Sequence, residues 1–179
     1  MKHPFIFAPE KAIETILYIV NKLQAANFHR ISKMMYFADK AHLEEYGCFI
    51  CGDSYIAMKH GPVPNCTYDI LKAVQGDGFA LANNIIEEAK RAFTVLQDNS
   101  IVKPLRKVDL DELSESEMEC LDRAISQYGT LSFQALSELS HDAPWQAADE
   151  NDCIDIERIV ALFPNAELLL EHLKEPYPG

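Results

Sequence analysis

Apolar residues recur three and four positions apart along most of the chain, which is the spacing of one face of an α-helix. In the first half this pattern predicts helices over residues 9–25, 28–46, 65–75 and 80–91. Asn27 is a suitable cap for the second helix and Gly47 a suitable end, while Gly76-Asp77-Gly78 should close the third. Between the second and third of these predicted helices, residues 48–64 do not follow the helical spacing.

Residues 48–64 and 93–104 carry the signals of extended structure. A turn at Gly52-Asp53 should lead into a short extended stretch over residues 54–59, which the loop Gly61-Pro62-Val63-Pro64 should stop because proline lacks an N–H. Residues 93–96 and 101–102, separated by four polar residues, predict a β-hairpin. Pro104 should confine the second strand to a sheet edge or end it.

Beyond residue 109 the helical spacing returns. Ser114 and Glu117 form a capping box, Ser132 should cap a helix carrying Phe133, and a turn holding Trp145 follows Pro144. Helices over 156–163 and 166–174 should be capped by Asp155 and Asn165. The predicted fold is mainly α (α+β): a single compact domain over 1–179, with six to eight helices and a small antiparallel β-hairpin. A candidate subdomain break lies near 104–113, and 175–179 should be a frayed tail.

The composition is that of one globular domain, and its most informative feature is the net charge of −12. Apolar residues make up 48% of the 179 residues, and no run approaches the roughly 18 apolar residues that span a membrane. The apolar patch at residues 5–8 is too short for a secretory signal, so we expect a cytoplasmic protein without membrane partners. Five scattered cysteines argue against a disulfide framework.

Acidic residues are concentrated in the C-terminal third. Residues 1–108 carry 13 Lys and Arg and 11 Asp and Glu, whereas residues 109–179 carry 3 and 17, giving net charges of +2 and −14. Such a body should repel nucleic acid and attract a basic protein. An acidic surface that simply keeps the protein soluble is the alternative.

Asp39, His42 and Glu45 follow one another at i,i+3 spacing in the second predicted helix. A carboxylate that orients a histidine is a common plan for a general base or a metal site, so a hydrolase or metalloenzyme using Asp39 and His42, with His141, is one hypothesis. We favour the simpler interpretation, a polar cluster whose imidazole is satisfied by Asp39 or by backbone. The chain has no Walker sequence, dinucleotide glycine fingerprint or HExxH.

Cys48 and Cys51 have the spacing of a zinc knuckle or a redox pair. They are weak metal candidates, because the other cysteines are singletons and His29, His60 and His141 are isolated. No cofactor is expected. Basic residues do not cluster with aromatic ones, so direct nucleic-acid binding is not expected either.

Three stretches together resemble the Panacea or SocA-like antitoxin family, whose members are often labelled phage-associated proteins. The first is MYFADKAHLEEYG at 35–47, and the second is GDSYIAMKHGPVP at 52–64, followed by YDILK at 68–72. The third and weaker stretch is LSESE at 113–117 together with His141 and Pro144-Trp145. The resemblance covers about residues 10–150, and the combination of the first two stretches is its specific part.

The resemblance implies a non-enzymatic antitoxin that neutralises a cognate toxin by direct binding. Alternatively, as in the SocA type, it implies an adaptor that delivers the toxin to a cytosolic AAA+ protease. We expect the matching residues to serve as scaffold and binding face: Tyr36, Asp39, His42, Tyr46, Gly52, Asp53, Tyr55, Met58, Gly61, Pro62, Val63, Tyr68, His141 and Trp145. The four tyrosines suit either the edge of a core or a protein interface.

Overall fold

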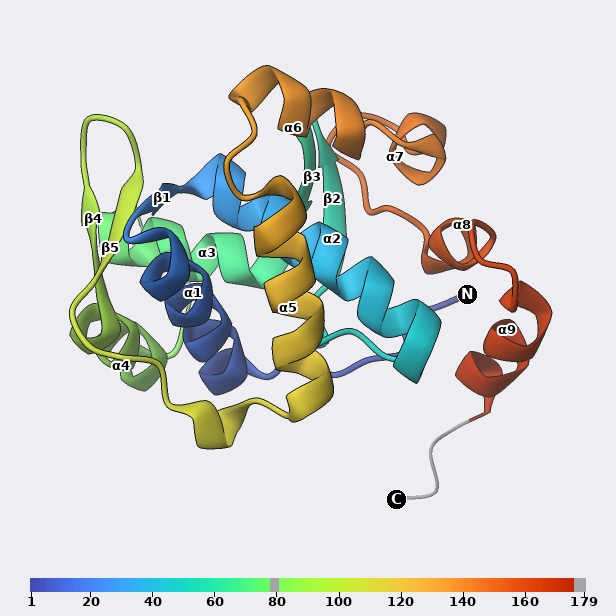
Figure 1. Cartoon of the computed structure of the whole chain (residues 1–179), viewed down its shortest axis with the longest axis horizontal. Helices are drawn as coiled ribbons and strands as arrows, with labels where there is room; N and C mark the ends of the chain where they lie inside the picture. Colours follow the sequence, from blue (N-terminus) through green and yellow to red (C-terminus); the bar gives the residue numbers. More distant parts are fainter. Residues whose placement is uncertain (78–80, 176–179) are drawn as a thin grey trace.

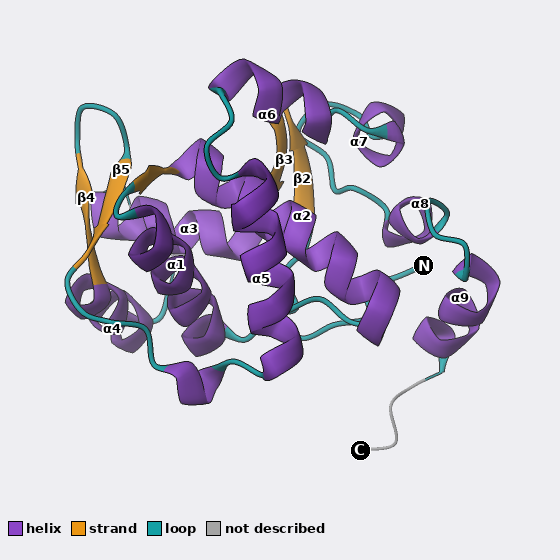
Figure 2. Ribbon diagram, in the orientation of Figure 1, coloured by secondary structure: helices purple, strands orange, loops and turns teal. Residues whose placement is uncertain are grey.

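The computed structural model describes residues 1–77 and 81–175 and confirms a mainly α fold with small antiparallel sheets (Figures 1 and 2). The helices within these residues are α1 (Pro9–Leu23), α2 (Phe28–Tyr46), α3 (Asn65–Gln75), α4 (Asn83–Ala92), α5 (Glu115–Tyr128), α6 (Phe133–Ser140), α7 (Ala143–Ala147), α8 (Ile156–Val160) and α9 (Ala166–Lys174). The strands are β1 (Ala26–Asn27), β2 (Tyr55–Met58), β3 (Gly61–Pro64), β4 (Phe93–Leu96) and β5 (Ile101–Pro104), and Leu110–Glu112 form a 3₁₀ turn.

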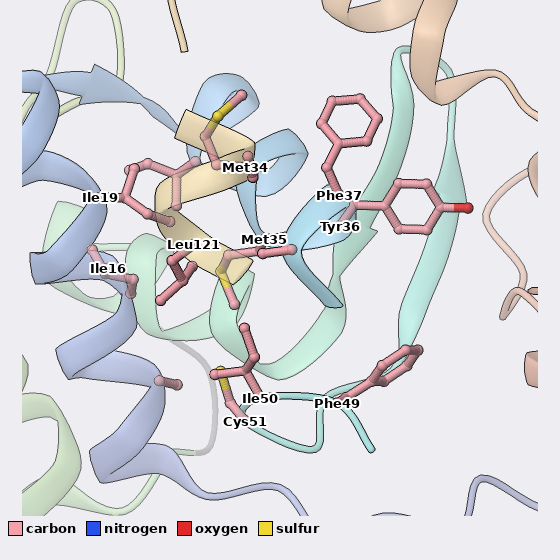
Figure 3. Close-up of a cluster of buried hydrophobic side chains, with 14 of the residues drawn as sticks. Ile16, Ile19, Met34, Met35, Tyr36, Phe37, Phe49, Ile50, Cys51 and Leu121 are labelled. Carbon is pink, nitrogen blue, oxygen red and sulfur yellow. The ribbon is translucent and has the colours of Figure 1, made fainter. Parts of the chain in front are cut away.

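Helix α2 is the central element of the core. Every residue from Ile31 to Asp39 is buried, because α1, α5 and the β2–β3 hairpin cover the helix on several sides. Figure 3 shows Ile16 and Leu121, from α1 and α5, beside Met34 and Met35 of α2, with residues 49–51 at the lower end. This apolar cluster is contiguous from α1 to α9.

The β4–β5 hairpin forms as predicted, but its second strand is not at an edge. β5 lies between β4 and β1, with Ala26 opposite Val102, so the sheet order is β1-β5-β4. Of the two alternatives predicted for Pro104, ending the strand is the correct one. β5 is not at the edge because β1 pairs with it, and β1 has only two residues between two helices, too few to show a strand pattern.

Residues 61–64, predicted as a loop, form strand β3 instead. β3 pairs antiparallel with β2, Pro62 opposite Ala57 and Pro64 opposite Tyr55. The N–H and C=O of Ala57 bond outward to Asp152 and Asn151, so the Ala57–Pro62 pair needs no N–H from the proline. Both prolines therefore fit a strand at positions where a ladder donor is not required.

The C-terminal segment protects the free edge of this hairpin. Ile154 N–H donates to Tyr55 O, and Ile56 forms a bridge with Cys153. Helices α6 and α7 lie over one end of the hairpin, and α8 and α9 continue along the side of the molecule where the N-terminus lies (Figure 1). The outer edge of β2 is thus covered by the chain itself.

Several predicted boundaries need correction. α1 ends at Leu23 and α8 at Val160, earlier than the patterns suggested. Asn165 precedes α9 without a side-chain cap, and its amide Nδ2 donates to Glu44 O. The predicted roles of Gly78, of residue 80 and of tail residues 176–179 lie outside the described residues. Within the described ranges, no helix has the length and apolar character needed to cross a membrane.

Candidate functional site

Asp39 joins α2 to the two segments that follow it. One carboxylate oxygen accepts the Ile50 N–H at 2.7 Å and the other accepts the Tyr55 hydroxyl at 2.6 Å. Asp39 is only 1% exposed, and this burial raises the pKa of its carboxyl to about 7. Asp39 therefore acts as a buried connector between α2, the 48–54 loop and β2.

Asp53 performs a second connecting role, at the start of α3. Its carboxylate accepts the backbone N–H groups of Cys66 and Thr67 and the Thr67 hydroxyl, at 2.7–3.0 Å. The residue before α3, Pro64, makes no side-chain cap, so a carboxylate from twelve positions before the helix satisfies its free donors. The neighbouring Gly52 has φ +71°, and a Cβ there would lie 2.2 Å from Ile6 O.

His42 is satisfied by groups other than Asp39. Its Nδ1 bonds the Cys48 carbonyl at 2.8 Å and its Nε2 bonds Ser116 Oγ at 3.0 Å. Because a carbonyl only accepts, Nδ1 carries the proton and Nε2 accepts from Ser116. Of the two partners suggested from sequence, the backbone is correct and Asp39 is wrong. His141 stacks instead on Trp145, so the three groups of the hydrolase hypothesis each have separate partners.

Cys48 and Cys51 are both free thiols in this structure. Cys51 is buried and donates to Thr15 Oγ1, and burial raises the pKa of each thiol, which disfavours the thiolate that binds metal. Among the described residues, no three His, Cys, Asp or Glu side chains are grouped so as to hold a metal ion. The pair contributes to packing at the end of α2.

The weaker third stretch meets the first two through Asp142. The hydroxyl of Tyr36, a fully buried residue, donates to the Asp142 carboxylate at 2.8 Å, and Lys40 Nζ lies 2.8 Å from the same group. Asp142 also caps α7 by accepting the Trp145 N–H, while the Trp145 indole donates to Met58 O at 2.9 Å. Residues far apart in the sequence thus form one connected unit around the β2–β3 hairpin.

Burial divides the family-like residues into two groups. Tyr36, Asp39, His42, Gly52, Asp53, Tyr55, Gly61 and Pro62 are buried and hold the scaffold together. Met58, Val63, Tyr68, His141 and Trp145 are half-buried and lie around the hairpin; we call these five residues the hairpin face. Tyr46 is 47% exposed at the far end of α2, where its ring packs on His42.

Two hollows flank the hairpin at Met58 and Lys59. The first, of about 420 Å³, has walls formed by Phe28, His29, Lys33, His60, Tyr68 and Phe133; we call it the Lys33 hollow. The second, of about 470 Å³, lies beside Trp145, Gln146 and Glu150. Half-buried aromatic side chains beside hollows are typical of protein-binding surfaces.

Basic side chains gather at the Lys33 hollow. Lys33 is 1% exposed, and desolvation lowers its pKa to about 7 although Nζ donates to Pro62 O at 2.8 Å. Burial and then the Lys33 charge lower the pKa of His29 to about 4. The same two causes lower the pKa of His141, whose Nε2 has no hydrogen-bond partner among the described residues.

Sequence reasoning missed Lys33, Lys59 and Phe133 and treated His29 and His60 as isolated. One signal was available: Lys33 stands within the most apolar segment of the second predicted helix, which a buried lysine or a narrow polar strip on that helix would explain. The stacking of His29 on Phe133, with centroids 4.0 Å apart, joins residues 104 positions apart and has no local signature.

A comparison with protein-family models matches residues 31–146 to the model described as antitoxin SocA-like, Panacea domain. The matched range is more than half of the chain. It contains the β2–β3 hairpin, the family-like residues that line the two hollows, and the residues that contact Asp142. A search of curated proteins and a search of solved structures each found no match.

Proposed function

Because the chain belongs to the SocA-like antitoxin family that carries the Panacea domain, we propose that it is a cytoplasmic antitoxin that neutralises its toxin by direct binding through the hairpin face. The observation that carries this proposal is the convergence of the less buried family-like residues. Met58, Tyr68 and Trp145 come from separate elements and lie around one hairpin beside two hollows. The buried residues of the same stretches fix that hairpin to α2.

The chemistry of this surface suits protein recognition better than catalysis. Asp39 and His42 are buried and fully engaged with structural partners, so neither is placed to act on a substrate. Aromatic and Met side chains around hollows provide anchoring area for a partner. In this proposal neither nucleic acid nor a membrane is needed, because the toxin itself is the ligand.

Phe133→Glu should abolish neutralisation while leaving the fold intact. Phe133 is 48% exposed in the wall of the Lys33 hollow, so a charge there would oppose close packing of a partner. We expect the affinity for the toxin to fall about 100-fold, the effect of losing an interface hot spot. The measurement is growth rescue on co-expression with the protein encoded beside this gene, with binding of the two purified proteins.

Leu139→Glu is the matched control for Phe133→Glu. Leu139 is 49% exposed on the same helix, α6, but points to a different side, between α2 and α5. Equal loss of rescue by both variants would contradict a binding site at the hairpin. In rescued cells the toxin should persist in a complex; its disappearance by proteolysis would instead indicate the adaptor role.

A second surface should contribute to the speed of association. A groove of about 720 Å³ between α1 and α5 is lined by Glu115, Glu119 and Asp122, within the third of the chain that carries −14. If the toxin surface is basic, raising the salt concentration from 20 to 500 mM should slow association about tenfold or more, because salt screens long-range attraction. Stopped-flow measurement of an unchanged rate would remove this electrostatic role.

A further inference from the structure

The Lys33 hollow differs in charge from the rest of this acidic protein. The chain has 28 Asp and Glu against 16 Lys and Arg, yet no Asp or Glu is among the described residues that line this hollow. His29, Lys33, Lys59 and His60 all line it. A concave site with two lysines and no carboxylate favours an anionic ligand.

Lys33 retains unused hydrogen-bonding capacity. An ammonium group has three N–H donors, and Pro62 O is the one acceptor for Lys33 among the described residues. Burial disfavours the charged form, and the nearby histidines bring no compensating negative charge. A carboxylate placed in the hollow would supply both an acceptor and the missing countercharge.

The first turns of two helices border the same hollow. Phe28 and His29 begin α2, and Phe133 begins α6, so the positive ends of both helix dipoles lie at this site. Between these ends the walls are apolar and aromatic, with Met58, Val63 and Tyr68 on the hairpin side. The site therefore combines two lysines and two helix N-termini with a surface for an apolar group.

We propose that the Lys33 hollow is a binding site for a carboxylate joined to an apolar body, with Lys33 pairing the carboxylate and Phe133 and Tyr68 contacting the apolar part. A phosphate fits less well, because the described lining contains no Arg to form a bidentate contact. The carboxylate belongs either to a free organic acid or to a partner protein; only the second source rests on the proposed function.

The test is calorimetric titration of the full-length protein with 3-phenylpropionate. We expect a Kd on the order of 1 mM, typical for a ligand of this size. The uncharged 3-phenylpropanol should bind at least tenfold more weakly, since it lacks the charge that Lys33 pairs. Absence of 3-phenylpropionate binding at ten times the expected Kd would overturn the proposal and leave the proposed antitoxin function untouched.

Two variants assign the binding to this hollow. Lys33→Met keeps an unbranched side chain as far as Cε but removes the ammonium group, and it should reduce affinity for 3-phenylpropionate at least tenfold. Lys103→Met, at an exposed residue of β5, should not change the affinity. If Lys33→Met proves unstable, Phe133→Ala at an exposed position provides the same test through the apolar wall. Equal affinity of all variants would place the ligand elsewhere and refute the assignment.

Proton uptake provides an independent readout. At pH 8 most Lys33 amines are neutral, because burial lowers the pKa to about 7, so pairing with a carboxylate should draw in a proton. Titrations in two buffers of different ionisation enthalpy should show this uptake in the native protein and not in Lys33→Met.

A competition experiment identifies the source of the carboxylate. Competition between 3-phenylpropionate and the protein encoded beside this gene identifies the partner protein as the source, whereas binding without competition identifies a free organic acid.

Discussion

Replacing Asp39 with alanine is expected to lower the free energy of unfolding by about 4 kcal/mol, because two buried donors lose their acceptor and a cavity remains. The donors are the Ile50 N–H and the Tyr55 hydroxyl, at 2.7 and 2.6 Å. Release of the buried carboxyl from its desolvation penalty offsets part of this loss and is the reason that the value is not larger. Urea unfolding followed by far-UV circular dichroism measures the change.

Asp39→Asn separates hydrogen bonding from charge. The amide oxygen can still accept from Ile50, while its NH₂ group faces a tyrosine hydroxyl that can rotate to accept. We therefore expect a loss of about 2 kcal/mol, half that of the alanine variant. If Asp39→Ala were as stable as the native protein within 1 kcal/mol, the connector role of Asp39 would be refuted.

For the native protein compared with Asp39→Asn, we expect a difference in stability that depends on pH with a definite sign. In the folded protein the pKa of Asp39 is about 7, above the 3.8 of an exposed aspartate, so the folded state holds this proton more tightly than the unfolded chain. The stabilisation is complete below about pH 4 and is lost as pH rises towards 7. Relative to Asp39→Asn, the native protein should therefore lose stability between about pH 4 and pH 7. A gain in stability over this range would contradict the raised pKa of Asp39.

Elements that depend on local sequence could be predicted, and those that depend on distant contacts could not. The 3.6-residue spacing identified α1, α2 and α5, and the capping box at Ser114 and Glu117 formed as expected. β1 was missed because it has only two residues, and β3 because it contains two prolines, which a strand tolerates only where its register against β2 requires no N–H donor. Burial of Lys33 likewise depends on α6 and the hairpin packing over it.

The candidate site shows the same division. The family-like stretches were recognisable in sequence, but their separation into buried connectors and the hairpin face was not. Tyr36 and Tyr55 are fully buried, whereas Tyr68 borders a hollow, although all three looked equivalent as aromatic residues with a polar end. What distinguishes them is the partner that each hydroxyl or ring meets, and those partners, such as Asp142, lie up to 106 positions away.

Gly61→Ala should be the second strongly destabilising substitution, because it affects the turn on which the hairpin face depends. Gly61 has φ +113°, and a Cβ there would lie 2.4 Å from Ser140 Oγ and 2.7 Å from Lys33 Cε. We expect a loss of about 3 kcal/mol, the sum of the backbone strain and the displacement of α6 from the hairpin. Thermal and urea unfolding measure the loss, and binding of 3-phenylpropionate should weaken with it.

Gly76→Ala separates backbone strain from packing. Gly76 has nearly the same backbone angle, φ +109°, but a Cβ there would meet nothing within 4 Å, so this variant should lose only about 1 kcal/mol. Combining Gly61→Ala with Ser140→Ala removes the nearest contact, and the double variant should therefore be more stable than the sum of the two single losses predicts. Equal losses for Gly61→Ala and Gly76→Ala would mean that α6 does not rest on the hairpin turn as closely as the structure places it.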